Sequence, residues 1–322
     1  MNGPYLANRL ILGETPGTTA LPRPFGVPSS IPVAIYYPYR ASASNAIHIS
    51  GGGPFPVLLY AHAYRSPADA SQTPDHPPSR DFTEVGFMLS HVVSYGCVCV
   101  VPDLSWLSVG TRTDFDDRAA VLAACYEYLL DALNASLFAN QLDLSRVVLV
   151  GHSTGAGGAT HAGRILAGYS HVHSLSYGLV APVFSCDCGP DTRNLVVMGS
   201  SWDVDEDANP RDAYAHAGRP ETLIMLPGAS HFGYLDNLCP SDNSCGRALV
   251  EDVDGKISRD AQQNTAAAYL ASLVRYYALG DTTQIPYLAG QRIVEGLDAL
   301  GVSGIQVQSN GVTLRPTPGP NQ

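Results

Sequence analysis

Short apolar runs and longer segments with helical character alternate along most of this chain. Seven apolar runs predict strands, at residues 31–37, 57–61, 97–101, 147–150, 175–180, 195–198 and 223–226. Four other segments predict helices, at residues 82–94, 119–133, 157–167 and 265–279. Wholly apolar runs are typical of strands covered on both faces, and strands that alternate with helices indicate a mostly parallel sheet. The pattern therefore predicts an α/β fold with helices on both faces of a central sheet.

The pattern changes towards both ends of the chain. Residues 1–30 are rich in Pro, Gly, Ser and Thr, which predicts an extended N-terminal segment. Residues 31–280 carry the predicted strands and helices and form one α/β domain. Residues 281–322 form a C-terminal extension, and its Pro- and Gly-containing tail from Pro316 is predicted to be disordered.

The amino-acid composition argues against two classes of binding partner, nucleic acids and the interior of a membrane. The 322 residues carry a formal net charge of −11, and 45% of them are hydrophobic. This acidic balance argues against nucleic acid as a partner, because phosphate binding needs a basic surface. The chain has no window of about 18 consecutive apolar residues, so we predict no membrane span. The oligomeric state is not indicated by the sequence.

Neither the cysteines nor the N-terminus settles the compartment. Cys97 and Cys99 alternate with valines in a predicted strand and are expected to be buried thiols. Four cysteines in loop-like segments allow two disulfides in an oxidising compartment, namely Cys186, Cys188, Cys239 and Cys245. Residues 1–17 lack the basic start and apolar run of a secretory signal. The chain as numbered is therefore expected to be cytoplasmic, or secreted if a signal was removed before residue 1.

The segment Gly151-His152-Ser153-Thr154-Gly155 indicates a catalytic serine. It follows the apolar run 147–150 directly and precedes a helix of small residues, which is the context of a nucleophile elbow. Larger side chains at Gly151 and Gly155 would clash in so tight a turn. The turn also places Ser153 at the positive end of the next helix, where an oxyanion is stabilised.

A serine hydroxyl needs a base, and in this arrangement the acid and then the histidine follow the serine along the chain. Five histidines come after the elbow. Only His231 follows the last predicted strand and a flexible Pro-Gly-Ala-Ser loop, which puts it at the carboxyl edge of the sheet. His231 is therefore the predicted base.

The acid is expected in the loop after the strand 195–198. Asp203 is the first carboxylate there, and Asp205 is the first alternative to it, followed by Glu206 and Asp207. We predict Asp203 as the acid, which would hold the histidine tautomer and stabilise the imidazolium.

Two backbone N–H groups are needed to bind an oxyanion. We assign one to Thr154, directly after the nucleophile, and the other to Tyr64 after the strand 57–61, with Ala63 as the alternative. Only one helix and one strand fit between the elbow and the strand 195–198, which leaves no room for a large cap domain. The pocket is therefore expected to be an open cleft. Five aromatic residues are its candidate walls: Trp106, Phe184, Trp202, Phe232 and Tyr64.

Several segments resemble the chlorophyllase, platelet-activating-factor acetylhydrolase and cutinase-like polyesterase group of α/β-hydrolases. Residues 55–64 (FPVLLYAHAY) resemble the group's oxyanion segment, although Ala63 stands where the group usually has Gly. The helix, strand, elbow, acid-loop and histidine-loop segments are also similar, at residues 89–102, 151–155, 197–203 and 228–232. Thr154 departs from the Met, Arg or Phe of named subgroups. The resemblance spans about residues 30–280 and implies the α/β-hydrolase fold and ester or thioester hydrolysis without a cofactor.

We therefore expect a serine carboxylesterase that forms an acyl-enzyme with short- to medium-chain or bulky-alcohol esters, polyesters included. Two alternatives stay open, a dienelactone-type lactone or C–C hydrolase on the same fold and a non-catalytic binding protein on a hydrolase scaffold. The acidic segments 203–209 and 252–257 begin like calcium loops but lack essential ligand positions, so no metal is expected.

Overall fold

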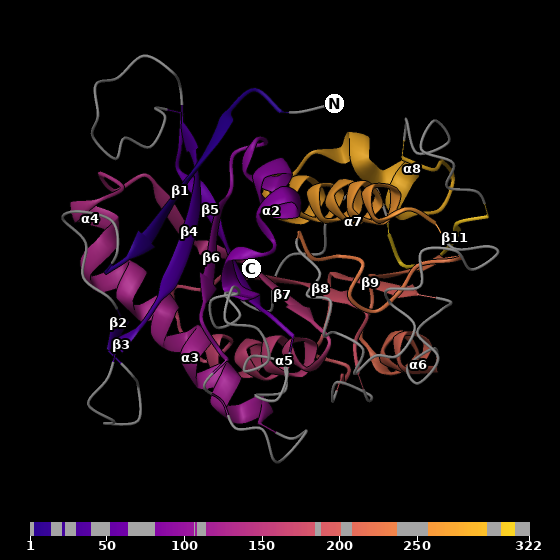
Figure 1. Ribbon diagram of the computed structural model, residues 1–322, viewed down its shortest axis with the longest axis horizontal. Coiled ribbons are helices and arrows are strands. Elements are labelled where there is room, and N and C mark those ends of the chain that lie inside the picture. The colour runs from indigo at the N-terminus through magenta and orange to yellow at the C-terminus, as the bar shows by residue number, and fades with distance from the viewer. Residues whose placement is uncertain are drawn as a thin grey trace, which may run out of the picture.

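A central sheet with helices on both sides organises the molecule (Figure 1). The structure is a computed structural model. It describes residues 3–13, 21–22, 30–39, 52–63, 81–105, 107, 114–183, 188–200, 208–236, 257–294 and 304–312.

The main sheet of the described residues has nine strands in the order β1-β4-β6-β5-β7-β8-β9-β10-β11. Their bounds are β1 Leu6–Leu12, β4 Val33–Tyr39, β5 Phe55–Ala61, β6 Val98–Pro102, β7 Leu142–His152, β8 Ser174–Val180, β9 Leu195–Ser200, β10 Glu221–Leu226 and β11 Gln306–Asn310. Neighbouring strands from β6 to β10 are parallel, whereas β4 runs antiparallel to β1 and β6, and β11 runs antiparallel to β10. A separate pair joins β2 (Leu21–Pro22) to β3 (Ser30–Ile31). The predicted α/β class and its mostly parallel sheet are confirmed.

All seven predicted strands are present. Strands β5, β9 and β10 are buried at every position, which explains why each of them gives an apolar run without alternation. Strand β7 starts five residues before the run 147–150, because its first half alternates between buried leucines and half-buried polar residues. Cys97 and Cys99 are fully buried, as predicted.

Helices cover both faces of the sheet (Figure 1). One face packs against α3 (Phe115–Tyr128), α5 (Thr154–Leu166) and α6 (Ala208–His216), and the other against α2 (Gly86–Val93), α7 (Arg259–Leu273) and α8 (Ile285–Leu288). A 3-10 turn, Asp81–Thr83, precedes α2. One π-helical turn, Leu129–Leu133, continues α3 into α4 (Asn134–Ser136), and another, Val274–Ala278, continues α7. A 3-10 turn, Thr282–Gln284, leads into α8. The four predicted helices are confirmed, with ends that shift by a few residues.

The elements that were not predicted include two edge strands of the main sheet and helix α6. Residues 6–12, inside the segment expected to be an extended entry, form β1 and pair with β4. Residues 306–310, inside the C-terminal extension, form β11, and no residue of that strand is buried. A strand as exposed as β11 has no apolar run to reveal it, whereas the apolar run of β1 is limited to Leu10, Ile11 and Leu12. Helix α6 is also polar on average, so its sequence resembles a loop.

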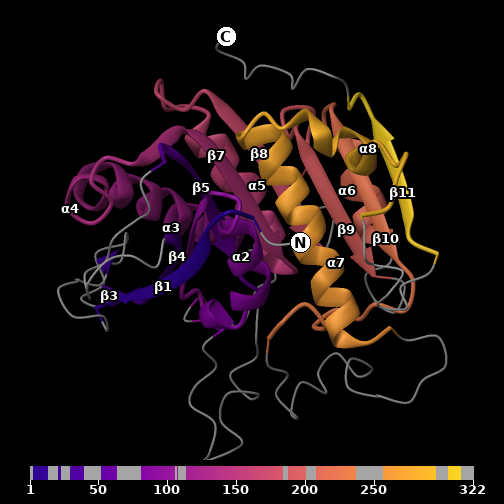
Figure 2. The same ribbon diagram turned by 90° about the horizontal axis from the view of Figure 1, so that it is seen from above.

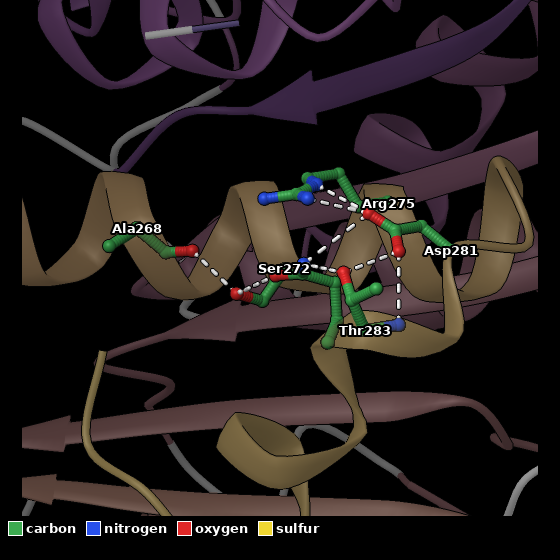
Figure 3. A network of polar contacts seen from close by, with 6 residues as sticks. Ala268, Ser272, Arg275, Asp281 and Thr283 are labelled. Atoms are coloured by element: carbon green, nitrogen blue, oxygen red, sulfur yellow. Dashed lines mark hydrogen bonds and ion pairs between the residues drawn. The ribbon is translucent and has the colours of Figure 1, made fainter. Parts of the chain in front are cut away.

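The C-terminal end of α7 is held by a polar network (Figure 3). Arg275 Nη2 lies 2.6 Å from Asp281 Oδ2, and Asp281 also accepts a hydrogen bond from the backbone N–H of Thr283 at 3.0 Å. The Arg275 guanidinium lies over the ring of Tyr95, 4.6 Å from its centroid, which connects α7 to the segment after α2. Helix α7 itself packs over β8 and β9 (Figure 2).

Candidate active site

Ser153 occupies a strained turn between β7 and α5. Its backbone has φ 57° and ψ −125°, a region that is costly for any residue with a side chain, by about 1–3 kcal/mol. Two hydrogen bonds hold it there, because its N–H donates to Val180 O at 3.0 Å and its carbonyl accepts from the N–H of Ala156 at 3.0 Å. The strain is therefore imposed by β8 on one side and by the first turn of α5 on the other.

The two glycines of the elbow are required by backbone contacts. A Cβ on Gly151 would lie 2.1 Å from the carbonyl oxygen of Gly155, within the same turn. A Cβ on Gly155 would lie 2.1 Å from the carbonyl oxygen of Ala61, at the end of β5. These distances confirm the predicted steric role of both glycines. They also show that the elbow lies directly against the end of β5.

Thr154 is the first residue of α5, so its N–H is among those left without a partner inside the helix. The helix dipole adds partial positive charge at the same end. Thr154 is 6% exposed. Its backbone is therefore placed where the sequence predicts the first oxyanion donor, beside the Ser153 backbone.

The chain after β5 is held by a buried histidine and a buried arginine. His62 Nε2 accepts a hydrogen bond from the Leu104 N–H at 2.7 Å, so the proton of the neutral ring is on Nδ1, which donates to Ala63 O at 2.8 Å. Arg118 Nη1 donates to the carbonyl of His62 at 3.0 Å, and Arg118 Nε donates to Asp114 Oδ1 at 3.1 Å. The carbonyl groups of two consecutive residues at this edge are thus fixed in direction.

His231 lies in the loop after β10 and is brought against the elbow by His152. His152 Nε2 donates to the His231 carbonyl at 2.8 Å, and the two imidazole rings lie 5.2 Å apart between centroids. Because His152 directly precedes Ser153, this contact places the predicted base and the predicted nucleophile at the same edge of the sheet. The pairing of Ser153 with His231 that the sequence predicts is therefore compatible with their positions.

Contacts from several elements, buried ones from α7 and an exposed one from α2, hold the histidine loop, residues 227–236. The side-chain amide of Gln262 on α7 makes two hydrogen bonds to Ser230, and Gln263 donates to Leu235 O. At the far end, Asp236 accepts a hydrogen bond from Phe87 N–H at the start of α2. Burial raises the pKa of Asp236, and hydrogen bonds from the backbone N–H groups of Phe87 and Gly86 oppose that rise. The loop is therefore fixed against α2 and α7.

Phe232 packs edge-on against His231, with ring centroids 4.9 Å apart, and is only 5% exposed. It therefore supports the histidine ring from beside it. The other predicted wall residues, Trp106, Phe184, Trp202 and Tyr64, lie outside the described residues. The same holds for the predicted acid Asp203 and its alternatives Asp205, Glu206 and Asp207, for the predicted donor Tyr64, and for Cys186, Cys239 and Cys245.

Three residues of this site were missed from the sequence. Arg118 has a signal that points to it, because it lies at positions i, i+3, i+4 and i+7 with Val121, Leu122 and Cys125, all buried on one face of α3. A lone charge on such an apolar face indicates a buried ion pair. His152 stood inside the elbow motif without being assigned a role. Gln262 had no signal, since nothing local relates a glutamine on α7 to Ser230.

A groove of about 1290 Å³ lies elsewhere, between β1, α2 and α7. Tyr5, Phe87, Tyr95 and Arg275 are among its lining residues, and none of the predicted site residues that the structure describes lines it. In the part of the chain that is described, no group of three or more His, Cys, Asp or Glu side chains is arranged to hold a metal ion. Within that same part, no helix has the length and hydropathy needed to cross a membrane.

No protein-family model matches this chain, and no curated protein matches its sequence. Its chemistry must therefore be inferred from its own residues.

Proposed function

We propose that this chain is a serine-dependent carboxylic ester hydrolase with the α/β-hydrolase fold. The observation that carries the proposal is the backbone of Ser153, held at φ 57° and ψ −125° between β7 and α5. Backbone strain of this kind clusters at active sites, because it persists only where the surroundings enforce it. A strained serine between a central strand and a helix N-terminus is the arrangement of a nucleophile elbow.

The sheet order supports the finer fold assignment. The elbow follows β7, in the middle of the parallel strands, and His231 follows β10, the last of them. Because parallel strands end at one edge, residues that follow them meet there, and the serine precedes the histidine along the chain as in α/β-hydrolases. This chain order agrees with the proposed roles of both residues.

In the proposed reaction, Ser153 Oγ attacks the ester carbonyl carbon while His231 accepts the hydroxyl proton. The tetrahedral oxyanion is stabilised by the N–H of Thr154 and by a second N–H after β5, assigned to Tyr64 with Ala63 as the alternative. His231 then gives the proton to the alkoxide oxygen, the C–O bond breaks, and the alcohol leaves an acyl-enzyme. Water, deprotonated by His231, releases the carboxylic acid and restores Ser153.

Asp203 is the proposed acid of the triad. Strand β9 ends at Ser200, whose hydroxyl lies 2.8 Å from the Tyr234 hydroxyl in the histidine loop. Three residues of chain span at most about 11 Å, so a carboxylate at position 203 is within reach of this loop. Asp205 is the alternative. The proposed role is to accept the Nδ1–H of His231 and so keep Nε2 free as base.

The proposed substrates are esters of short to medium acyl chains or of bulky alcohols, polyesters included. Between Ser153 and Val183 the chain forms α5 and β8, and neither builds a cap over the elbow. An uncapped cleft would bury only the first carbons of an acyl chain. Trp106, Phe184 and Trp202 are proposed as its walls, with Phe232 behind the base.

Labelling and hydrolysis together test this proposal. We expect a fluorophosphonate to label Ser153, with the site located by mass spectrometry, and we expect p-nitrophenyl butyrate to be hydrolysed. Ser153→Ala should lower turnover by about 10³-fold or more. Ser176→Ala is the matched control, since Ser176 is equally buried in the neighbouring strand β8 and should leave turnover unchanged. Label on another residue, or full turnover by Ser153→Ala, would exclude Ser153 as nucleophile. A lactone that is hydrolysed in preference to all acyclic esters would favour the lactonase alternative.

A further inference from the structure

Gln262 connects α7 to the residue that precedes His231. Its side chain is 1% exposed. Gln262 Oε1 accepts the Ser230 N–H at 3.0 Å, and Gln262 Nε2 donates to the Ser230 carbonyl at 2.6 Å. One buried amide therefore satisfies both backbone groups of Ser230, in the way that a neighbouring strand would.

The same contact fixes one side of the His231 backbone. Peptide groups are planar, so holding the Ser230 carbonyl also holds the plane that contains the His231 N–H. On the other side, His152 Nε2 holds the His231 carbonyl at 2.8 Å. The two peptide planes that flank the His231 Cα are thus each bound by a buried side chain. With both planes fixed, the direction of the Cα–Cβ bond is fixed as well, so the Cβ atom that carries the imidazole has a defined position.

The packing around Gln262 leaves little room for another arrangement. A Cβ on Gly233 would lie 2.3 Å from Gln262 Oε1, so the glycine makes space for the amide where the histidine loop turns back. Ser230 is 3% exposed, so water does not replace the amide as its partner without a change in the loop. The side-chain amide of Gln262 therefore packs inside the histidine loop, although Gln262 belongs to α7.

We propose that Gln262 is a positioning residue, which sets the orientation of His231 through the backbone of Ser230. This inference rests on the proposed function, because it assigns His231 the role of base. A misplacement of about 1 Å at a reacting group can cost on the order of 10²-fold in rate. Loss of the amide should therefore lower kcat and change KM little.

The neighbouring residue Gln263 provides a matched control. It lies on the same helix, is 6% exposed, and donates to the same loop at Leu235 O, four residues beyond the base. Gln262→Leu removes two buried hydrogen bonds and Gln263→Leu removes one, so both should lower the melting temperature, Gln262→Leu by the larger amount, while both variants stay folded at the assay temperature. A purely structural role would then give similar kinetics in both variants. A positioning role should lower kcat about 10- to 100-fold in Gln262→Leu alone.

Gln262→Glu is a second variant that preserves shape and adds a pH readout. The introduced carboxyl, when protonated, can accept from the Ser230 N–H and donate to the Ser230 carbonyl, but when ionised it can only accept. The activity of Gln262→Glu relative to wild type should therefore rise as the pH falls.

Titration of the His231 ring by NMR gives a readout that does not need turnover. We expect the ring signals to change in Gln262→Leu and to stay as in wild type in Gln263→Leu. Equal kinetic losses in the two leucine variants, with His231 signals unchanged in both, would overturn the positioning role. An unlabelled, inactive wild type would instead contradict the proposed function, and the NMR comparison would still decide whether Gln262 orients His231.

Discussion

Replacing Arg118 by methionine tests how the chain after β5 is held. Arg118 is 1% exposed and donates both to Asp114, the residue before α3, and to the carbonyl of His62. Methionine keeps an unbranched stem that can pack against Gly158, but it supplies no donor. The change removes the counter-ion of Asp114, whose side chain is only 6% exposed, and frees the His62 carbonyl to turn.

The expected loss is large because a buried charge is left uncompensated. Breaking a buried ion pair from one side costs about 3–5 kcal/mol. A buried carbonyl that loses its donor costs about 1–3 kcal/mol, and the two losses do not simply add. We therefore expect Arg118→Met to lower the free energy of unfolding by about 4 kcal/mol, a large share of the 5–15 kcal/mol typical of natural domains.

A second substitution should restore part of this loss. Asp114 precedes α3 and its side chain makes no capping hydrogen bond, so asparagine at that position removes the buried charge without the loss of a cap. The double variant Arg118→Met with Asp114→Asn is therefore expected to be about 2 kcal/mol more stable than Arg118→Met alone. We expect Arg118→Met to lower turnover, because the His62 carbonyl loses its donor, and we expect the double variant to have the same low turnover, because that donor is still missing.

Urea unfolding followed by circular dichroism measures these differences. Arg146→Met is the control, since Arg146 is 35% exposed, its ion pair with Asp143 should contribute about 0–1 kcal/mol, and the Ala278 carbonyl that it also binds is only partly buried, so its loss should stay well below that of Arg118→Met. A loss below about 1 kcal/mol for Arg118→Met would refute the reasoning. So would a double variant that is less stable than the single one.

Four further predictions concern the acid of the proposed triad, the dependence of turnover on metal ions, the dependence of stability on pH, and the preferred acyl chain length. Asp203→Asn should lower turnover far more than Asp205→Asn, because an amide supports the wrong imidazole tautomer, and the opposite ranking in a steady-state assay would move the acid to Asp205. Exhaustive chelation should leave turnover unchanged, since the proposed nucleophile is a side chain, and rescue by an added divalent cation would contradict this. Burial alone would raise the pKa of Asp281, but hydrogen bonds from Thr283 and Arg275 outweigh it and hold the pKa below the usual 3.8. The stabilisation from this lowered pKa is present above the unfolded-state pKa and is lost as the pH falls below about 4. The melting temperature of Asp281→Asn should therefore depend less on pH between pH 5 and pH 3 than that of the wild type, and an equal dependence in both proteins would count against this assignment. Hydrolysis of p-nitrophenyl esters should peak at short to medium acyl chains, since each further buried methylene contributes about 0.8 kcal/mol only while the pocket extends, and a rate jump with micellar long-chain substrates would show that a lid closes over the site.

The sequence predicts the interior of this fold better than its edges. Strands such as β5 and β10 are buried on both faces, and continuous apolar runs mark them directly. Strand β11 has no buried residue, and its place in the sheet depends on pairing with β10, which is distant in the sequence. Local patterns carry no information about such a pairing.

The same difference separates the predicted and the missed residues of the site. Ser153 is recognisable because its neighbours in the chain, Gly151 and Gly155, make the tight turn possible. His231 is recognisable because it follows a strand. The residues that hold these two come from elsewhere, as with Gln262 on α7, and only the folded chain brings them to the sheet edge.

The position of Gln262, about a hundred residues after the elbow, has a consequence during synthesis. The elbow and the strands around it leave the ribosome early, whereas the helix that binds Ser230 follows about a hundred residues later, several seconds at roughly 5–20 residues per second. Until α7 packs on the sheet, the segment with His231 lacks one of its two backbone supports. A nascent or prematurely terminated chain that ends before α7 would thus hold the His231 backbone by the His152 contact alone, and under the proposed function its Ser153 would lack a correctly oriented base until α7 has packed.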